Sequence, residues 1–240
     1  MAQRTAIVTG AGKRVGAVIA RALLDDGWAV IAHVHHADDD VPEGATKVVA
    51  DLAEPNAPER IFAAAPPSVD LLVNNAARFA WDGFGGFSIA EFDAHMAVNL
   101  RAPALLIDKF AAARSGGDAL VVNLLDSKLA APNPDYLSYT LSKHGLAALT
   151  ELAARALASQ GIRVNGIAPA LMLRSSGQSG ENFETMHANN PLRRGVEPGD
   201  VVAALRYLVG ATAVTGQMIT IDGGQRFMSL ERDVQFLGDA

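Results

Sequence analysis

The chain has 240 residues, and its composition, 50% hydrophobic and 19% charged, is typical of a folded domain with a substantial apolar core. The net charge of −6 disfavours a nucleic acid or an anionic membrane as partner. No cysteine is present, which excludes disulfides and thiolate chemistry, and no apolar stretch approaches the ~20 residues of a membrane span. A strand-like segment begins within a few residues of Met1 and leaves no room for a signal peptide, so we expect a cytoplasmic protein.

Short apolar segments rich in Val and Ile alternate along the chain with longer segments of helical period. The expected strands are 5–10, 28–34, 47–52, 70–76, 118–125, 162–169 and 216–224. The expected helices are 14–27, 91–113, 138–159 and 200–209. Continuously apolar strands separated by helices indicate a parallel sheet that is covered on both faces. We therefore predict one α/β domain over residues 1–240, a Rossmann-like doubly wound parallel sheet whose ligands bind at the carboxyl ends of the strands.

The longest stretch without a clear element runs from about Ala170 to Pro198. A loop of that length inside a compact domain is usually a functional lid or a disordered segment. A variable surface insertion is the alternative. We expect this stretch to lie over the substrate.

A glycine-rich turn, VTGAGKRVG, joins the first expected strand to the first helix and contains Gly10, Gly12 and Gly16. Glycines there let backbone N–H groups approach a pyrophosphate, and the helix N-terminus adds a favourable dipole. A tight structural turn would use the same residues. The position of the turn, directly after a first strand and opening a helix, favours a dinucleotide site.

The end of the second strand indicates which dinucleotide is bound. The sequence AHVHHADDD places His33, His35 and His36 where an acid that binds the ribose of NAD would stand. Arg14 in the glycine turn supplies a cation for a 2′-phosphate. Both features favour NADP(H), and the aspartates at 38–40 are interpreted as solvated turn residues.

A Tyr-x-x-x-Lys pair, Tyr139 and Lys143, lies on the expected helix 138–159. Residues four apart share one helix face, so the Lys143 ammonium is expected near the Tyr139 phenol, where its charge would lower a pKa that starts near ~10. Such a tyrosine can exchange a proton while a nicotinamide exchanges a hydride. An ordinary exposed contact between the two residues is the alternative.

With these motifs in order, the chain resembles the short-chain dehydrogenase/reductase family over nearly its whole length. The motifs that carry the resemblance are the glycine loop at 9–16, ADL at 50–52, NNA at 74–76, Asn99, Tyr139-x-x-x-Lys143, VNGIAP at 164–169 and TGQMITIDGG at 215–224. The resemblance implies that Lys143 also binds the nicotinamide ribose and that Asn99 helps to hold a proton-relay water. A helix-capping or packing amide is the alternative for Asn99. The family also implies association through two long helices, and we expect a homo-tetramer or dimer.

Asp126 stands thirteen residues before Tyr139, where most of the family has a serine that hydrogen-bonds the substrate carbonyl. A carboxyl group can deliver a proton to a basic ring nitrogen, and a position beside an apolar strand end should raise its pKa. The alternative is a slip of one residue that puts Ser127 in the place of the usual serine.

This aspartate makes the chain resemble the pteridine reductases, with the bacterial dihydromonapterin reductases close by. In that branch an arginine at the position of Arg14 serves both the cofactor phosphate and the pterin. A His-rich stretch like 33–36 follows the second strand, and Phe79 matches the aromatic residue that sandwiches the pterin ring against the nicotinamide. Tyr136 also fits the branch.

The chain departs from the branch at several positions, and these leave the identity of the substrate open. Ala77 follows NNA where serine is usual, and Arg78 stands where a small residue is common. His36 replaces a second cation on the cofactor side, and APA at 168–170 replaces the usual Pro-Gly. The inference is a fused heterocycle with a C=N bond.

These arguments predict three sets of site residues and no metal site, because His95, His144 and His187 lack metal-ligand spacing. The catalytic set is Asp126, Tyr139, Lys143 and Asn99, and the substrate-binding set is Arg14, Phe79, Asp126, Tyr136 and Tyr139. The cofactor-binding set is Gly10, Gly12, Lys13, Arg14, Val15, Gly16, His35, His36, Asp51, Leu52, Asn75, Ala76, Tyr139, Lys143 and Pro169.

The predicted activity is NADPH-dependent reduction of a pterin-type C=N bond, with Asp126 and Tyr139 as proton donors. An ordinary ketone or alcohol oxidoreductase of the same family is the first alternative. A non-enzymatic NADP-sensing protein is the second, although a pure sensor would need neither Tyr139 nor Lys143.

Overall fold

Seven parallel strands form one sheet, in the order β3-β2-β1-β4-β5-β6-β7, in a computed structural model that describes residues 3–114, 116–175 and 177–237. The strands are β1 (Thr5–Val8), β2 (Ala29–Val34), β3 (Thr46–Val49), β4 (Leu71–Asn74), β5 (Ala119–Leu124), β6 (Ile162–Pro169) and β7 (Met218–Ile221). The strand order reverses direction between β1 and β4. In such sheets, ligands bind in the crevice at the carboxyl ends of the strands where the order reverses.

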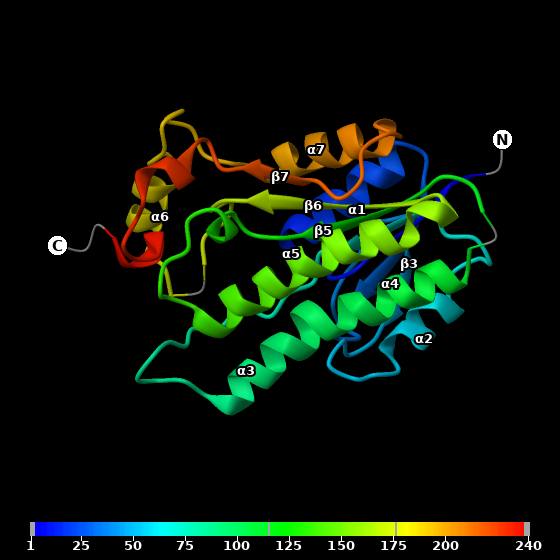
Figure 1. The fold of residues 1–240 in the computed structure, drawn as a ribbon, viewed down its shortest axis with the longest axis horizontal. Coiled ribbons are helices and arrows are strands. Elements are labelled where there is room, and N and C mark those ends of the chain that lie inside the picture. The colour runs from blue at the N-terminus through cyan, green and yellow to red at the C-terminus, as the bar shows by residue number, and fades with distance from the viewer. Residues whose placement is uncertain (1–2, 115, 176, 238–240) are drawn as a thin grey trace.

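Helices cover both faces of the sheet (Figure 1). On one face lie α1 (Arg14–Asp25) and α7 (Pro198–Gly210), whose apolar residues pack in one core cluster. On the other lie α2 (Ala57–Ala63), α4 (Ala102–Ala112) and α5 (Leu137–Leu157), whose residues pack in a second cluster. In β1, Ala6 and Val8 belong to the first cluster and Ile7 to the second. Because alternate residues of a strand point to opposite faces, this double burial explains why the strands are apolar without alternation.

The predicted Rossmann-like sheet with helices on both faces is confirmed, with strands somewhat shorter than expected. The expected helical stretch 91–113 is confirmed, and within it a π-helical turn, Ala97–Arg101, joins α3 (Ile89–Met96) to α4. Pro103 has no N–H to offer the Asn99 carbonyl four residues earlier. The missing bond accounts for a π turn at this place in the chain.

The stretch 170–198, expected to lack regular structure, contains the short helix α6 (Gly180–His187). Ser179 caps this helix, because its hydroxyl accepts a hydrogen bond from the Asn182 N–H at 3.0 Å. The helix is polar and only two turns long, so its sequence carries little helical periodicity. Within the described ranges, no helix is both long enough and apolar enough to cross a membrane.

Candidate active site

His33 supports the glycine loop from beneath. Its Nδ1 accepts a hydrogen bond from the Gly10 N–H at 3.2 Å, and its Nε2 bonds the Ala50 carbonyl at 3.0 Å. The ring therefore carries its hydrogen on Nε2 and is neutral, and burial lowers its pKa. Both ring nitrogens of His33 bond to protein backbone, so of the three histidines in this stretch only His35 and His36 belong to the predicted cofactor-binding set.

A cavity of about 680 Å³ runs along the carboxyl ends of the strands, from His35 and His36 past the glycine loop to Tyr139 and Lys143. Every residue of the predicted cofactor-binding set lines it. Backbone N–H groups at the start of α1 and a volume in the range of cofactor sites fit a dinucleotide here. That these residues bind the cofactor stays a prediction.

Asp39 is a solvent-accessible residue of the turn after β2, as interpreted, and it also lines this cavity. Its carboxylate accepts a hydrogen bond from the His36 N–H at 3.1 Å, and this bond lowers the pKa of Asp39. The turn after β2 folds back toward the glycine loop, where the Asp40 carbonyl approaches Gly12. That return is a tertiary contact, which the residue types alone do not indicate.

A second, smaller cavity of about 210 Å³ adjoins the first, and Arg14, Phe79, Asp126 and Tyr139 line both. Tyr136, predicted to bind substrate, lines neither cavity. Instead its ring stacks against Phe79, with 4.2 Å between ring centroids, and therefore backs the residue that faces the cavity.

Arg14 bridges the glycine loop and the segment after β6. Its guanidinium donates hydrogen bonds to the carbonyls of Leu173 and Arg174, at 3.3 and 3.1 Å. Its backbone has a φ of +52°, a left-handed conformation uncommon for a residue other than glycine. The stretch 170–198 therefore contacts the cofactor side of the site through Arg14, and Leu171, Met172 and Ser175 line the smaller cavity.

Asp126 faces the catalytic tyrosine. The Tyr139 hydroxyl donates a hydrogen bond to Asp126 Oδ2 at 2.8 Å, and Asp126 Oδ1 accepts one from the Lys128 N–H at 2.8 Å. Asp126 ends the extended backbone after β5, and a 3₁₀ turn, Ser127–Leu129, follows it. The aspartate therefore occupies the position next to the tyrosine, and Ser127 lines only the smaller cavity.

Among the pKa shifts of Asp126, Tyr139 and Lys143, the shift of Tyr139 differs from the one predicted from the sequence. Burial raises the pKa of Asp126, as expected. The pKa of Tyr139 is raised well above its usual value by burial and by the Asp126 carboxyl group, so the predicted lowering by Lys143 is wrong. Lys143 donates to the Leu124 carbonyl at 2.5 Å, and burial lowers its own pKa to about 8. Asp126 and Tyr139 thus both favour their protonated forms.

A stability measurement can check the raised pKa of Asp126. A carboxyl group whose pKa is higher in the folded than in the unfolded state contributes stability that is lost as the pH rises through the folded pKa. We expect Asp126→Asn, which does not titrate, to gain about 1 kcal/mol, or 2–4 °C in Tm, relative to the parent between acidic and neutral pH. Urea unfolding of both proteins across that range gives the difference. A difference that is independent of pH would contradict the raised pKa.

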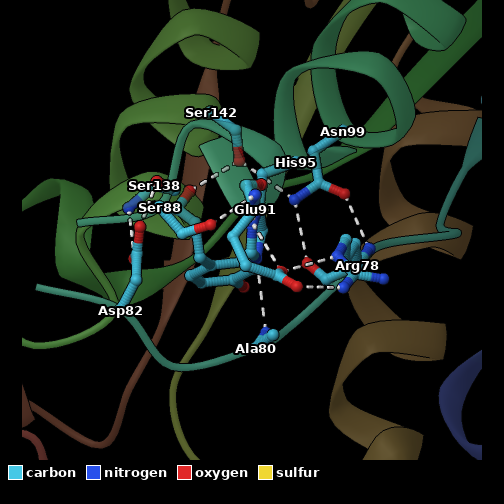
Figure 2. A network of polar contacts seen from close by, with 10 residues as sticks. Arg78, Ala80, Asp82, Ser88, Glu91, His95, Asn99, Ser138 and Ser142 are labelled. Carbon is cyan, nitrogen blue, oxygen red and sulfur yellow. Dashed lines mark hydrogen bonds and ion pairs between the residues drawn. The ribbon is translucent and has the colours of Figure 1, made fainter. Parts of the chain in front are cut away.

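Phe79 lies on a segment that is anchored on both sides by buried side chains of α3 and the π turn (Figure 2). The Asn99 amide accepts from the Arg78 N–H at 2.7 Å and donates to the Arg78 carbonyl at 3.0 Å and to the Ser142 hydroxyl at 2.9 Å. His95 Nε2 accepts from the Ala80 N–H at 3.3 Å. The Asn99 side chain therefore holds the chain beside Phe79, as the packing alternative expected, and its role in a water relay stays a prediction.

His95 is fully buried, and its Nδ1 bonds the Glu91 carbonyl at 2.7 Å, which fixes Nε2 as the acceptor for Ala80. We expect His95→Phe to free this side of the Phe79 segment and to raise the KM of the substrate about tenfold with a smaller change in kcat, because a misplaced contact affects binding first. Steady-state kinetics of this variant and of His144→Gln, at an exposed histidine, would check it. Equal losses in both variants would contradict the anchoring role.

A family model described as enoyl-(acyl carrier protein) reductase matches residues 10–226 of the chain. The chain belongs to the short-chain dehydrogenase/reductase family. The crystal structure of FolM alternative dihydrofolate reductase 1 from Brucella suis, in complex with NADP, superposes on this chain with a TM-score of 0.88. It is 35% identical, over 93% of this chain and 95% of its own.

Curated relatives in this short-chain dehydrogenase/reductase family act on different substrates. Pteridine reductase 1 of Leishmania tarentolae is 30% identical over 91% of this chain and 95% of its own length. L-xylulose reductase of Bos taurus is 31% identical over 93% of this chain and 97% of its own. The chain is an oxidoreductase of the family, and identity alone does not select between a heterocycle and a carbonyl substrate.

Sequence reasoning missed one wall of the smaller cavity. Residues that follow β7 line it: Gln225, Arg226, Leu230, Asp233 and Val234. They follow the last family motif and have no periodicity of their own, so no local pattern marks them as site residues. Only the fold brings them next to Asp126.

Proposed function

We propose that this protein is an NADPH-dependent reductase of a pterin-type C=N bond. The observation that carries the proposal is the hydrogen bond of 2.8 Å between the Tyr139 hydroxyl and the Asp126 carboxyl group, at the junction of the two cavities. A serine hydroxyl at position 126 would serve a carbonyl oxygen. A carboxyl group with a raised pKa is an acid suited to a basic ring nitrogen.

The chain's residues fit NADP(H) on one side of this junction. NADPH, when bound, supplies a hydride to the ring carbon of the C=N bond. Tyr139 and Asp126 hold the proton that the ring nitrogen must accept, so that the bond gains two electrons and two hydrogens. After Tyr139 has donated, Asp126 can return a proton to it along the hydrogen bond that joins them. Lys143 holds its ammonium beside the Tyr139 ring, 5.6 Å from the ring centroid, and neutralises the charge left behind.

Phe79 and Arg14 are proposed to hold the heterocycle. Phe79 lines both cavities, and its ring lies edge-on to Tyr139 with 4.7 Å between centroids. A flat ring placed on the face of Phe79 would lie close to the Tyr139 hydroxyl. Arg14 supplies donors to the pterin and to the cofactor phosphate.

The proposal is tested by following NADPH oxidation with dihydrobiopterin, dihydromonapterin and dihydrofolate, beside a panel of ketones. Turnover of pterins at least tenfold above the best ketone in kcat/KM supports it. Turnover of ketones alone favours the second candidate, a carbonyl reductase, which the likeness to L-xylulose reductase supports. Repeating the assay with NADH tests the NADP preference.

The proposal includes self-association through α4 and α5. Both helices carry exposed leucines, namely Leu105 on α4 and Leu141 and Leu152 on α5. Exposed apolar residues on two adjacent helices are typical of an interface between subunits. Sedimentation equilibrium would give a dimer or tetramer, and a monomer at all concentrations would contradict this part.

A further inference from the structure

The C-terminal segment, residues 229–237, forms part of the outer wall of the smaller cavity, which we call the substrate cavity. Leu230, Asp233 and Val234 line that cavity together with Asp126 and Tyr139. The segment lies beside α6 at the carboxyl ends of β6 and β7 (Figure 1). The Asn182 side chain of α6 donates a hydrogen bond to the Leu237 carbonyl at 2.6 Å.

Two ion pairs hold this segment against the loop that precedes α5. The Arg232 guanidinium donates two hydrogen bonds to the Asp135 carboxylate, both at 2.8 Å, and the Asp233 N–H donates a third at 2.8 Å. The Lys128 ammonium pairs with Asp233 at 2.8 Å. Asp135 is buried, and its pair with Arg232 lowers its pKa, so it is a carboxylate. We call Lys128, Asp135, Arg232 and Asp233 the charge clasp.

The charge clasp is connected to two residues that line the cavity, Asp126 and Phe79. The backbone N–H of Lys128 donates to Asp126, and the Lys128 ammonium also donates to the Asp135 carbonyl at 3.0 Å. Tyr136, next to Asp135, stacks on Phe79, and its hydroxyl donates to the Gln235 side chain at 2.5 Å. The C-terminal segment is therefore fixed to the residues that carry the acid and the aromatic platform.

We propose that the charge clasp determines substrate specificity by holding the C-terminal segment as the outer wall of the substrate cavity. The cavity volume, about 210 Å³, is smaller than the ~300 Å³ at which ordinary ligand pockets begin, so it favours a small flat ring over bulky carbonyl compounds. The claim about selectivity rests on the proposed function, whereas the claim that the clasp holds the wall does not.

The absence of cysteine allows a direct measurement of the wall. In a Val234→Cys protein, the single thiol reports how often the segment opens to a thiol reagent. Adding Arg232→Gln or Asp135→Asn is expected to speed labelling about five- to tenfold, because lost ion pairs shift a local opening equilibrium. Arg206→Gln is the matched control. Arg206, on α7, donates two hydrogen bonds to the Asp26 carboxylate, at 2.8 and 2.9 Å, as Arg232 does to Asp135. This variant is expected to leave the rate unchanged.

Kinetics without the added cysteine complete the test. Arg232→Gln is expected to raise the KM of the preferred small substrate about tenfold with little change in kcat, and to raise kcat/KM for bulky ketones. Unchanged labelling in both clasp variants, with their Tm values showing that they are folded, overturns the proposal. Faster labelling with unchanged selectivity overturns the specificity role. If no pterin turns over in the parent protein, the proposed function fails, and the labelling result still decides whether the clasp holds the wall.

Discussion

Asp126→Ser is expected to lower kcat/KM for dihydropterins by about 10²–10⁴, the usual contribution of a positioned general acid. In the parent protein the Tyr139 hydroxyl donates a hydrogen bond to the Asp126 carboxyl group, whose pKa is raised by burial. A serine would keep a hydroxyl beside Tyr139 and would lose the acid. Ketone reduction takes its proton from Tyr139 and needs from position 126 only a hydrogen bond to the carbonyl oxygen, so it is expected to be maintained or to rise.

The pH dependence of kcat/KM distinguishes the loss of the general acid from a structural defect of the variant. In the parent protein, kcat/KM for a pterin is expected to fall as the pH rises through the raised pKa of Asp126, because the proton-bearing form disappears. In Asp126→Ser the decrease of kcat/KM that follows the Asp126 pKa is expected to be absent. The remaining pH dependence of kcat/KM is then expected near the pKa of Lys143, about 8. Ser127→Ala is the control and is expected to stay within about threefold of the parent, since Ser127 is not the residue that contacts Tyr139. Full pterin activity in Asp126→Ser would falsify the role of the acid.

Several site residues that the sequence predicted lie at the carboxyl ends of strands or directly after them. Gly10, Asn75, Asp126 and Pro169 belong to four different strands or to the turns directly after them. Parallel strands put their carboxyl ends along one edge, so residues that end successive strands meet there whatever the details of packing. The cavity that collects the predicted cofactor-binding set is a consequence of this geometry.

The parts that the sequence did not predict depend on which group meets which across the fold. His33 has the residue type of a phosphate ligand, yet its ring is turned under the glycine loop, between Gly10 and Ala50. The pKa of Tyr139 follows from its partner Asp126 and from burial, and the helical spacing to Lys143 fixes neither. The wall formed by 229–237 depends on ion pairs with residues about a hundred positions away.

Gly16→Ala is expected to lower NADPH affinity by more than about 10² and to destabilise the fold by about 1–3 kcal/mol, the usual range for an overpacked site. A Cβ at position 16 would lie 2.0 Å from the Gly10 carbonyl oxygen and 2.5 Å from Asn75 Nδ2. Both neighbours are fixed. Gly10 has a φ of +65° and bonds His33, and the Asn75 amide donates to the carbonyls of Thr9 and Gly10.

The glycine loop can accept a methyl group at position 16 only by moving away from α1, which displaces the N–H groups that face the cofactor cavity. Gly199→Ala provides the control, because a Cβ there meets no atom within 4 Å, and α7 is expected to gain up to about 1 kcal/mol from the better helix former. Titration calorimetry with NADPH and urea unfolding of both variants measure the two effects. Cofactor affinity in Gly16→Ala close to that of the parent would mean that the loop is not the pyrophosphate site, since no smaller movement can relieve a contact of 2.0 Å with a backbone oxygen.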